Sequence, residues 1–314
     1  MIETLALYGG PKAAADPFPP WPRLCDKALA DAAEVLRSGR LAAYAGTRVA
    51  AFEQAWAAWC GAPHAVAVAS GTAALHVALL ALGIGPGHEV IVPSHTFAST
   101  ALAVAQAGAT PVFCDVTPDQ TIDPRGIEPL VTERTKALVV VHLYGIVCNL
   151  GPILEVASAY GLAVVEDCAQ AAGAEWRGRK VGTIGDAGCF SFSQTKHLTT
   201  AGEGGMVVTG RADIADPLRS LRDYGRAPAD QASPSLHVRL GWNYRMTEVQ
   251  AAVGLAELER LSDWNLARRR GFARAYEVPF DMLKRREELY RRVLAETLKP
   301  RPIPPTSGRP SGPS

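Results

Sequence analysis

The stretch Ser191–Gly205 reads SFSQTKHLTTAGEGG and indicates where two strands of the expected central sheet meet a candidate reactive lysine. It connects two apolar runs, Ala187–Phe192 and Met206–Val208, which we predict to be short buried strands. A single lysine, Lys196, stands among Ser, Thr and Gln residues after the first run. A lysine in such a place can lose its proton and act as a nucleophile. The alternative is a surface lysine in a glycine-rich turn, and this stretch alone does not decide between the two.

Strand and helix patterns alternate through the rest of the chain. The expected strands are Ala65–Val68, Val90–Val92, Pro111–Phe113, Ala137–Val141 and Ala163–Val165. The expected helices are Asp26–Arg37, Val49–Trp59, Ala73–Leu82, Ala98–Ala107, Gly151–Tyr160 and Thr247–Leu261. This alternation predicts an α/β fold with a mostly parallel central sheet flanked by helices. Ligands of such sheets bind at the carboxyl ends of the strands.

The composition is that of a globular protein. The chain has 314 residues, of which 48% are hydrophobic and 20% charged, enough for one large domain with an appendage or for two domains. The net charge of +1 gives no reason to expect nucleic acid or an anionic membrane as a partner. The six cysteines include no Cys-x-x-Cys pair, so we expect reduced thiols in a cytoplasmic protein and no metal site.

Two polar clusters follow expected strands. Ser70-Gly71-Thr72-Ala73 joins a strand to a helix, where backbone N–H groups and the positive helix end suit a phosphate. A serine at such a junction is, however, more often only an N-cap. Glu166-Asp167 closes another strand, and a buried carboxylate needs a cation or several hydrogen-bond donors. Without such a cation, Asp167 would simply cap the next turn.

Four motifs, in this order, carry a resemblance to a known family. They are SGTAAL at 70–75, EDCAQ at 166–170, the lysine stretch at 191–205 and GWNYRMTEVQAA at 241–252. Over about residues 5–270 the chain resembles the DegT/DnrJ/EryC1/StrS aminotransferases. These are fold-type I, aspartate aminotransferase-like enzymes that use pyridoxal 5'-phosphate (PLP) to aminate keto-sugars and related cyclic ketones. The resemblance therefore implies PLP as the cofactor.

The resemblance also implies the roles of individual residues. Lys196 would carry the PLP Schiff base, and Asp167 would keep the ring nitrogen protonated so that the ring accepts electrons. The other implied cofactor-binding residues are Gly71, Thr72, Ala73 and Ser191 at the phosphate, Phe97 against the ring, Gln170 near the ring hydroxyl and Asn243. Asn243 would reach the phosphate of a neighbouring subunit's cofactor. Arg245 and Tyr224 belong to the same region, with roles that the resemblance leaves open.

The implied activity is transfer of an amino group from glutamate or glutamine to a keto-sugar, nucleotide-linked or cyclitol. The pathway would be amino-sugar, antibiotic or cell-surface polysaccharide biosynthesis, and the enzyme a homodimer with composite active sites. Some family members are sugar dehydratases with a histidine in place of the lysine. Counted from Ser191, Lys196 occupies that position and His197 follows it, which favours an aminotransferase. The alternative that the chain is an impaired or regulatory member of the family stays open. A nicotinamide oxidoreductase is disfavoured, since the turn Gly83–Gly87 follows an expected helix instead of a strand.

The resemblance ends near Arg270, where the family continues with a small α/β domain. We expect an N-terminal arm over residues 1–24, a PLP-binding domain over 25–265, a helical remnant of the small domain over 266–300 and a disordered tail over 301–314. A helix is expected at Asp281–Leu298. These features suggest a chain cut short, with an open cofactor cleft that would impair transamination.

Overall fold

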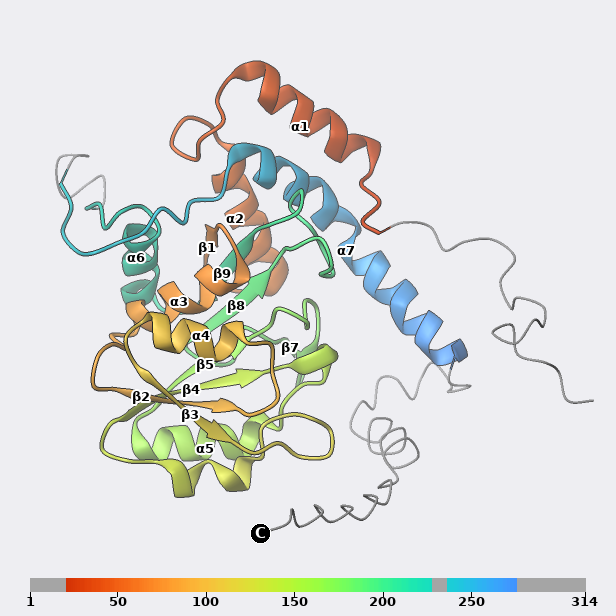
Figure 1. Cartoon of the computed structure of the whole chain (residues 1–314). Helices are drawn as coiled ribbons and strands as arrows, with labels where there is room; N and C mark the ends of the chain where they lie inside the picture. Colours follow the sequence, from red (N-terminus) through yellow and green to blue (C-terminus); the bar gives the residue numbers. More distant parts are fainter. Residues whose placement is uncertain (1–20, 228–235, 276–314) are drawn as a thin grey trace, which may run out of the picture.

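The structure is a computed structural model that describes residues 21–227 and 236–275 (Figure 1). Its centre is a seven-stranded sheet with the order β1-β9-β8-β5-β4-β2-β3. The strands are β1 (His64–Val68), β2 (Glu89–Pro93), β3 (Thr110–Cys114), β4 (Thr135–Val141), β5 (Ala163–Asp167), β8 (Ala187–Ser191) and β9 (Gly205–Thr209). A separate hairpin pairs β6 (Glu175–Trp176) with β7 (Arg179–Lys180).

The sheet is parallel from β8 through β5, β4 and β2 to β3. Only β9 runs against its neighbours β1 and β8. It does so because the 192–204 connection returns directly from β8 into the adjacent strand, as antiparallel strands allow. The predicted α/β fold with a mostly parallel sheet is confirmed.

Helices cover both faces of the sheet (Figure 1). They are α1 (Asp26–Ser38), α2 (Arg48–Cys60), α3 (Gly71–Ala81), α4 (Ser99–Gln106), α5 (Leu150–Tyr160), α6 (Ala212–Leu221) and α7 (Glu248–Ala275). Short 3-10 turns lie at Pro124–Gly126, Glu128–Leu130 and Leu143–Gly145. None of the helices in the described part of the chain has both the length and the apolar character that a membrane span requires.

Side-chain alternation along the strands divides the core in two. On β4, Ala137 and Val139 pack with α3, α4 and α6, whereas Leu138 and Val140 pack with α5 on the opposite face. That second face is completed over β1, β8 and β9 by α2 and α7, around the fully buried Trp56. Both faces of the inner strands are therefore buried, which explains their continuous apolar runs, whereas the edge strand β3 is partly exposed, as at Phe113.

Two helices differ from expectation. α6 was not predicted. Pro217 lies within it, and a proline inside a segment argues against a helix even though the spacing of the buried residues Ile214 and Leu218 fits one. α7 continues to Ala275, so the predicted end at Leu261 is wrong. The apolar stripe stops near Leu261, but the arginine- and alanine-rich residues that follow favour a helix. The expected arm up to residue 20, the helix 281–298 and the 301–314 tail lie outside the described residues, and the domain division stays a prediction.

Candidate active site

Lys196 lies in the connection between β8 and β9, at the carboxyl end of β8. Backbone hydrogen bonds close this connection: the Phe192 N–H donates to the Gly204 carbonyl (2.8 Å) and the Gln194 N–H to the Gly202 carbonyl (3.0 Å). The Lys196 N–H donates to the carbonyl of Ser193 at 2.9 Å. The lysine is thus presented by a turn whose backbone is fixed on both sides.

Asp167 is the last residue of β5, the parallel neighbour of β8, and is 5% exposed. Its Oδ1 accepts the Ala169 N–H at 3.1 Å, and its Oδ2 accepts the Thr100 hydroxyl at 2.9 Å. Burial raises the pKa of Asp167, while these two hydrogen bonds and the charge of Lys196 act to lower it. The carboxylate therefore sits where a bound cation would offset much of the cost of its burial.

Thr100 is a site residue that sequence reasoning missed. It lies in the first turn of α4, is fully buried, and its Oγ1 is also 2.8 Å from the Thr96 Oγ1. The only signal in the sequence is a threonine directly before the apolar run Ala101–Val104. Its distance in the chain from Asp167 hides the contact.

The residues predicted to bind a phosphate lie at the start of α3 and are called the cup below; their role stays a prediction. Ser70 is the N-cap, and its Oγ accepts the Ala73 N–H at 3.1 Å. Of the three predicted cup residues, Gly71 and Thr72 therefore present the N–H groups that a helix leaves without partners at its first turn. A Cβ on Gly71 would lie 2.7 Å from the Cβ of Ser191, so the cup and the predicted phosphate-binding serine are in direct contact.

Gly205 closes the cup from the other side. A Cβ at this position would overlap the carbonyl oxygen of Ser70, so that only glycine lets β9 approach the start of α3. Ser191 at the end of β8 and Gly205 at the start of β9 are paired residues in the sheet. The two ends of the lysine stretch thus pack directly against the cup.

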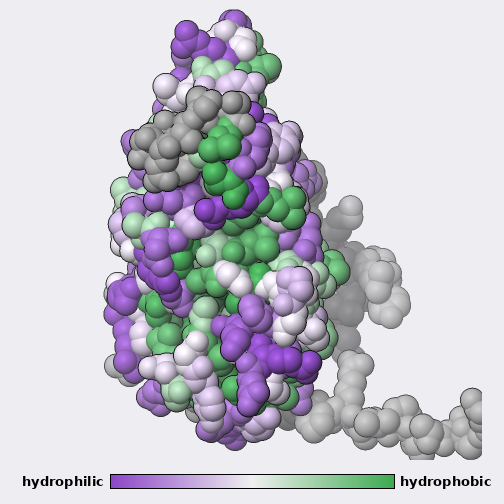
Figure 2. Space-filling view, turned by 90° about the vertical axis from the view of Figure 1, so that its left-hand side faces the viewer, coloured by the Kyte–Doolittle hydropathy of each residue, from purple (hydrophilic) through white to green (hydrophobic). Residues whose placement is uncertain are grey.

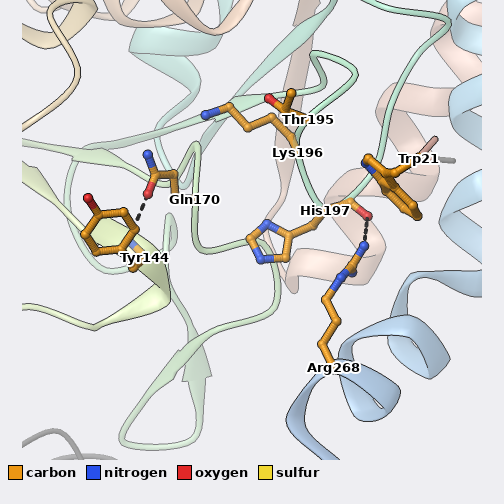
Figure 3. A pocket seen from close by; sticks show the side chains of 7 residues that line it. All are labelled: Trp21, Tyr144, Gln170, Thr195, Lys196, His197 and Arg268. Carbon is orange, nitrogen blue, oxygen red and sulfur yellow. Dashed lines mark hydrogen bonds between the residues drawn. The ribbon is translucent and has the colours of Figure 1, made fainter. Parts of the chain in front are cut away.

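A cavity of about 590 Å³ opens beside Lys196 (Figure 3). It is lined by Trp21, Tyr144, Gln170, Thr195, Lys196, His197 and Arg268. In Figure 3 the side chain of Lys196 extends toward Gln170, whose Oε1 accepts the Tyr144 N–H at 2.9 Å. The structure thus brings Lys196 and Gln170 to one cavity, and adds Trp21, Tyr144 and Arg268, which carried no recognisable motif in the sequence.

Lys196 and Gln170 are the predicted residues that line this cavity; the others do not line it, and two of those, Phe97 and Asn243, are exposed. Phe97 is 69% exposed in the loop between β2 and α4, and Asn243 is exposed and pairs with Asp223 through a backbone bridge. Arg245 forms an ion pair with Asp223 and lies 4.8 Å from the centre of the Tyr224 ring. The predicted contacts of Phe97 and Asn243 with a cofactor stay predictions.

A buried cluster of His142, Glu166 and Cys168 lies next to Asp167. Its polar atoms are already bonded: Glu166 accepts the N–H groups of Gly182, Ile184 and Gly185, and its Oε2 lies 3.1 Å from His142 Nε2. The Cys148 N–H faces His142 Nδ1 at 3.2 Å, which leaves the ring proton on Nε2, directed at Glu166. The donors and acceptors thus satisfy one another, and the cluster anchors the 182–185 loop to β5.

Comparison with known proteins identifies relatives of the whole described fold. The family model of the DegT/DnrJ/EryC1/StrS aminotransferase family matches residues 22–295. GDP-perosamine synthase of Caulobacter vibrioides is 49% identical over 72% of this chain, which spans 60% of that protein. The L-glutamine:2-deoxy-scyllo-inosose aminotransferase of Streptomyces fradiae is 42% identical over 87% of the chain, which spans 68% of it.

A solved structure gives the same result. An aminotransferase from Psychrobacter cryohalolentis superposes with a TM-score of 0.78 and 40% identity. The superposition covers 82% of this chain and 67% of that one. The aminotransferases of this family depend on PLP. A glycine-bounded anion cup, a buried carboxylate and a lysine at one edge of the sheet fit that cofactor.

Proposed function

The chain belongs to the DegT/DnrJ/EryC1/StrS aminotransferase family, and on this basis we propose that it is a PLP-dependent aminotransferase acting on a keto-sugar or a cyclitol. One observation carries the proposal: Asp167 and Lys196 stand at the carboxyl ends of the neighbouring parallel strands β5 and β8. The cup at the start of α3 lies at the same edge of the sheet, because Gly71 contacts Ser191 at the end of β8. When bound, PLP would supply an electron sink for the carbon atom that exchanges its amino group.

The residues of the chain would divide the remaining tasks. Gly71 and Thr72 would bind the phosphate through their N–H groups, together with the Ser191 hydroxyl. Asp167 would hold a proton on the ring nitrogen, because a cation there compensates its buried carboxylate. Lys196 would hold the cofactor covalently through Nζ and, once released by the donor, move a proton between carbon atoms as a general base.

The substrate class is supported by the names of the relatives. They include a GDP-perosamine synthase and a scyllo-inosose aminotransferase that uses L-glutamine. A UDP-linked glucosamine 3-aminotransferase is 47% identical. These names support an amino donor of the glutamate or glutamine type and an acceptor that is a nucleotide-linked keto-sugar or a cyclitol ketone.

We also propose a homodimer with composite active sites. Large hydrophobic side chains are exposed on the described residues, among them Phe97, Leu102, Phe113, Leu236, Val238 and Leu240. Hydrophobic residues gather across the middle of one face in Figure 2, as at surfaces that bind a second protein. Asn243 is exposed and does not line the cavity of its own chain, so it is free to contact a neighbouring subunit.

The cysteines support a reducing compartment, such as the cytoplasm. All six are free thiols, and five of them are buried. Burial raises the pKa of Cys60 to about 12, and a buried neutral thiol packs like a small apolar side chain.

An amination assay tests the proposed function. The protein would be incubated with a GDP-linked 4-keto-sugar, a UDP-linked 3-keto-sugar or 2-deoxy-scyllo-inosose, each with L-glutamate or L-glutamine. Mass spectrometry would then detect the aminated product. We expect amination of one of these ketones by wild-type protein and none by Lys196→Ala. Equal product from both proteins would contradict the assignment of Lys196.

A further inference from the structure

The lining of the cavity beside Lys196 contains basic side chains and no acidic one. Besides His197, two basic side chains line it, those of Lys196 and Arg268. The guanidinium of Arg268 donates to the carbonyl of His197 at 3.3 Å and to Asn265 Oδ1 at 3.2 Å, both neutral groups. Within the residues described, no acidic side chain pairs with Arg268, and burial alone lowers its pKa. Arg268 is exposed at this cavity, and a guanidinium whose hydrogen-bond partners are all neutral can still take an anion through a charge-assisted pair.

The pKa of His197 is also affected by the positive charges of Arg268 and Lys196. Burial, followed by the charges of Arg268 and Lys196, lowers the pKa of His197 to about 4, so its ring is neutral at pH 7. The ring Nδ1 is buried and lacks a hydrogen-bond partner among the described residues. His197 therefore neither adds to nor cancels the charge of Arg268.

Arg268 is held in a defined position. Its guanidinium lies 5.1 Å from the centre of the Trp21 ring and 6.0 Å from that of Trp264, and the two rings meet edge to face at 5.6 Å. Figure 3 shows Arg268 reaching from α7 toward His197, whereas Lys196 extends toward Gln170. A ligand that fills the cavity can thus meet the guanidinium with one end and the reactive lysine with the other.

We propose that Arg268 is the anion-binding residue of this cavity, where it takes the carboxylate of the amino donor or the phosphate of a nucleotide-linked sugar. The inference rests on the proposed aminotransferase function and names the substrate group that the site would hold. A planar guanidinium binds either group through two parallel N–H···O bonds, which are stronger than neutral hydrogen bonds. Stacking on Trp21 and Trp264 keeps this fork oriented at little entropic cost.

Equilibrium binding to the holoenzyme tests this proposal without turnover. Glutarate, a carboxylate ligand that lacks an amino group, and UDP, a diphosphate ligand, would each be titrated by calorimetry. Arg268→Met keeps the apolar stem against the tryptophans and removes the charge. Arg260→Met is the matched control, because Arg260 also stacks on Trp264, at 4.6 Å, but does not line the cavity.

We expect Arg268→Met to weaken at least one probe by roughly ten- to hundred-fold, the effect of losing a charged hydrogen-bonded pair. Arg260→Met should bind as wild type, and Arg268→Lys should restore part of the affinity. Weaker glutarate binding identifies the donor carboxylate as the ligand, and weaker UDP binding identifies the nucleotide phosphate. Affinities for both probes within two-fold of wild type in Arg268→Met would overturn the proposal.

A second readout separates this proposal from the proposed function. Burial lowers the pKa of His197 most, and the charges of Arg268 and Lys196 lower it further. An anion beside Arg268 would offset these charges, so a saturating probe should raise that pKa in an NMR titration of the imidazole. An unchanged His197 pKa under saturation would place the anion elsewhere and contradict the role of Arg268. That result would leave the attachment of PLP to Lys196 untouched, since a borohydride-reduced adduct measures it separately.

Discussion

The Oγ1 hydroxyl of Thr100 donates a hydrogen bond of 2.9 Å to Oδ2 of Asp167, and both residues are buried. This bond joins the first turn of α4 to the end of β5. The other carboxylate oxygen of Asp167, Oδ1, accepts a hydrogen bond from the Ala169 N–H. Asp167 is thereby fixed in orientation by two donors from its own chain. Its charge would otherwise be disfavoured by burial, which acts to raise its pKa.

Replacing Thr100 with valine should raise the pKa of Asp167 further. Thr100→Val keeps the shape of the side chain but removes a donor to the ionised carboxylate, a bond that contributes about 1.5–3 kcal/mol when its acceptor is charged. Thr100→Ser retains the hydroxyl and serves as the control. The carboxyl carbon-13 shift of Asp167, followed against pH in cofactor-free protein, measures the change. Equal pKa values in the valine and serine variants would show that the bond has no influence.

Enlarging Gly205 should distort the predicted phosphate-binding cup at the start of α3. In Gly205→Ala the new Cβ would overlap the Ser70 carbonyl oxygen, so β9 or the start of α3 must shift. We expect a loss of about 1–3 kcal/mol in the free energy of unfolding, as for other overpacked sites, and weaker PLP binding. Gly210→Ala is the control, because its Cβ would meet nothing within 4 Å. Chemical denaturation and cofactor titration measure both effects, and matching results for the two variants would refute this account of the cup.

His197 should make the protein acid-sensitive. The folded-state pKa of about 4 lies below the ordinary 6.5, so between these values the unfolded chain binds more protons than the folded one. Stability should therefore fall as pH decreases from about 6.5 toward 4, by at most roughly 3 kcal/mol at about 1.36 kcal/mol per pKa unit. His197→Asn should flatten the urea-unfolding profile in this pH window. A profile as steep as that of wild type would assign the acid sensitivity to other groups.

Mixed dimers test the proposed composite site. Lys196→Ala and Asn243→Ala would each be inactive as homodimers, but a heterodimer would keep one site with both residues intact. Co-expression with two different purification tags isolates the heterodimer, and we expect it to recover up to about half of the wild-type activity per dimer, since one of two sites is restored. An inactive, verified heterodimer would indicate that Asn243 serves the site of its own chain.

Much of this fold could be predicted because its strands are short apolar runs that end in polar residues. The runs ending at Val68, Asp167 and Ser191 lead straight into the cup, the carboxylate and the lysine turn. The prediction failed for α6 and for the end of α7, where the local sequence does not clearly indicate a helix. Pro217 masked α6, and the polar half of α7 follows no apolar stripe.

The supporting residues could not be predicted, for a different reason. Thr100 and Arg268 act through contacts with Asp167 and His197, residues that are distant from them in the sequence. Neither contact leaves a local spacing or motif, because it depends on how α4 and α7 pack on the sheet. Only the folded chain shows which hydroxyl or guanidinium faces the site.

The most direct measurement of the central claim is the position of the cofactor on the chain. Protein incubated with PLP would be reduced with borohydride, digested and analysed by mass spectrometry. We predict that the peptide containing Lys196 gains the mass of the reduced cofactor, that Lys196→Ala gains none, and that Lys180→Ala, which removes a lysine stacked on Trp59, is modified like wild type. A stoichiometric adduct on a lysine other than Lys196, or no adduct at all, would contradict the account.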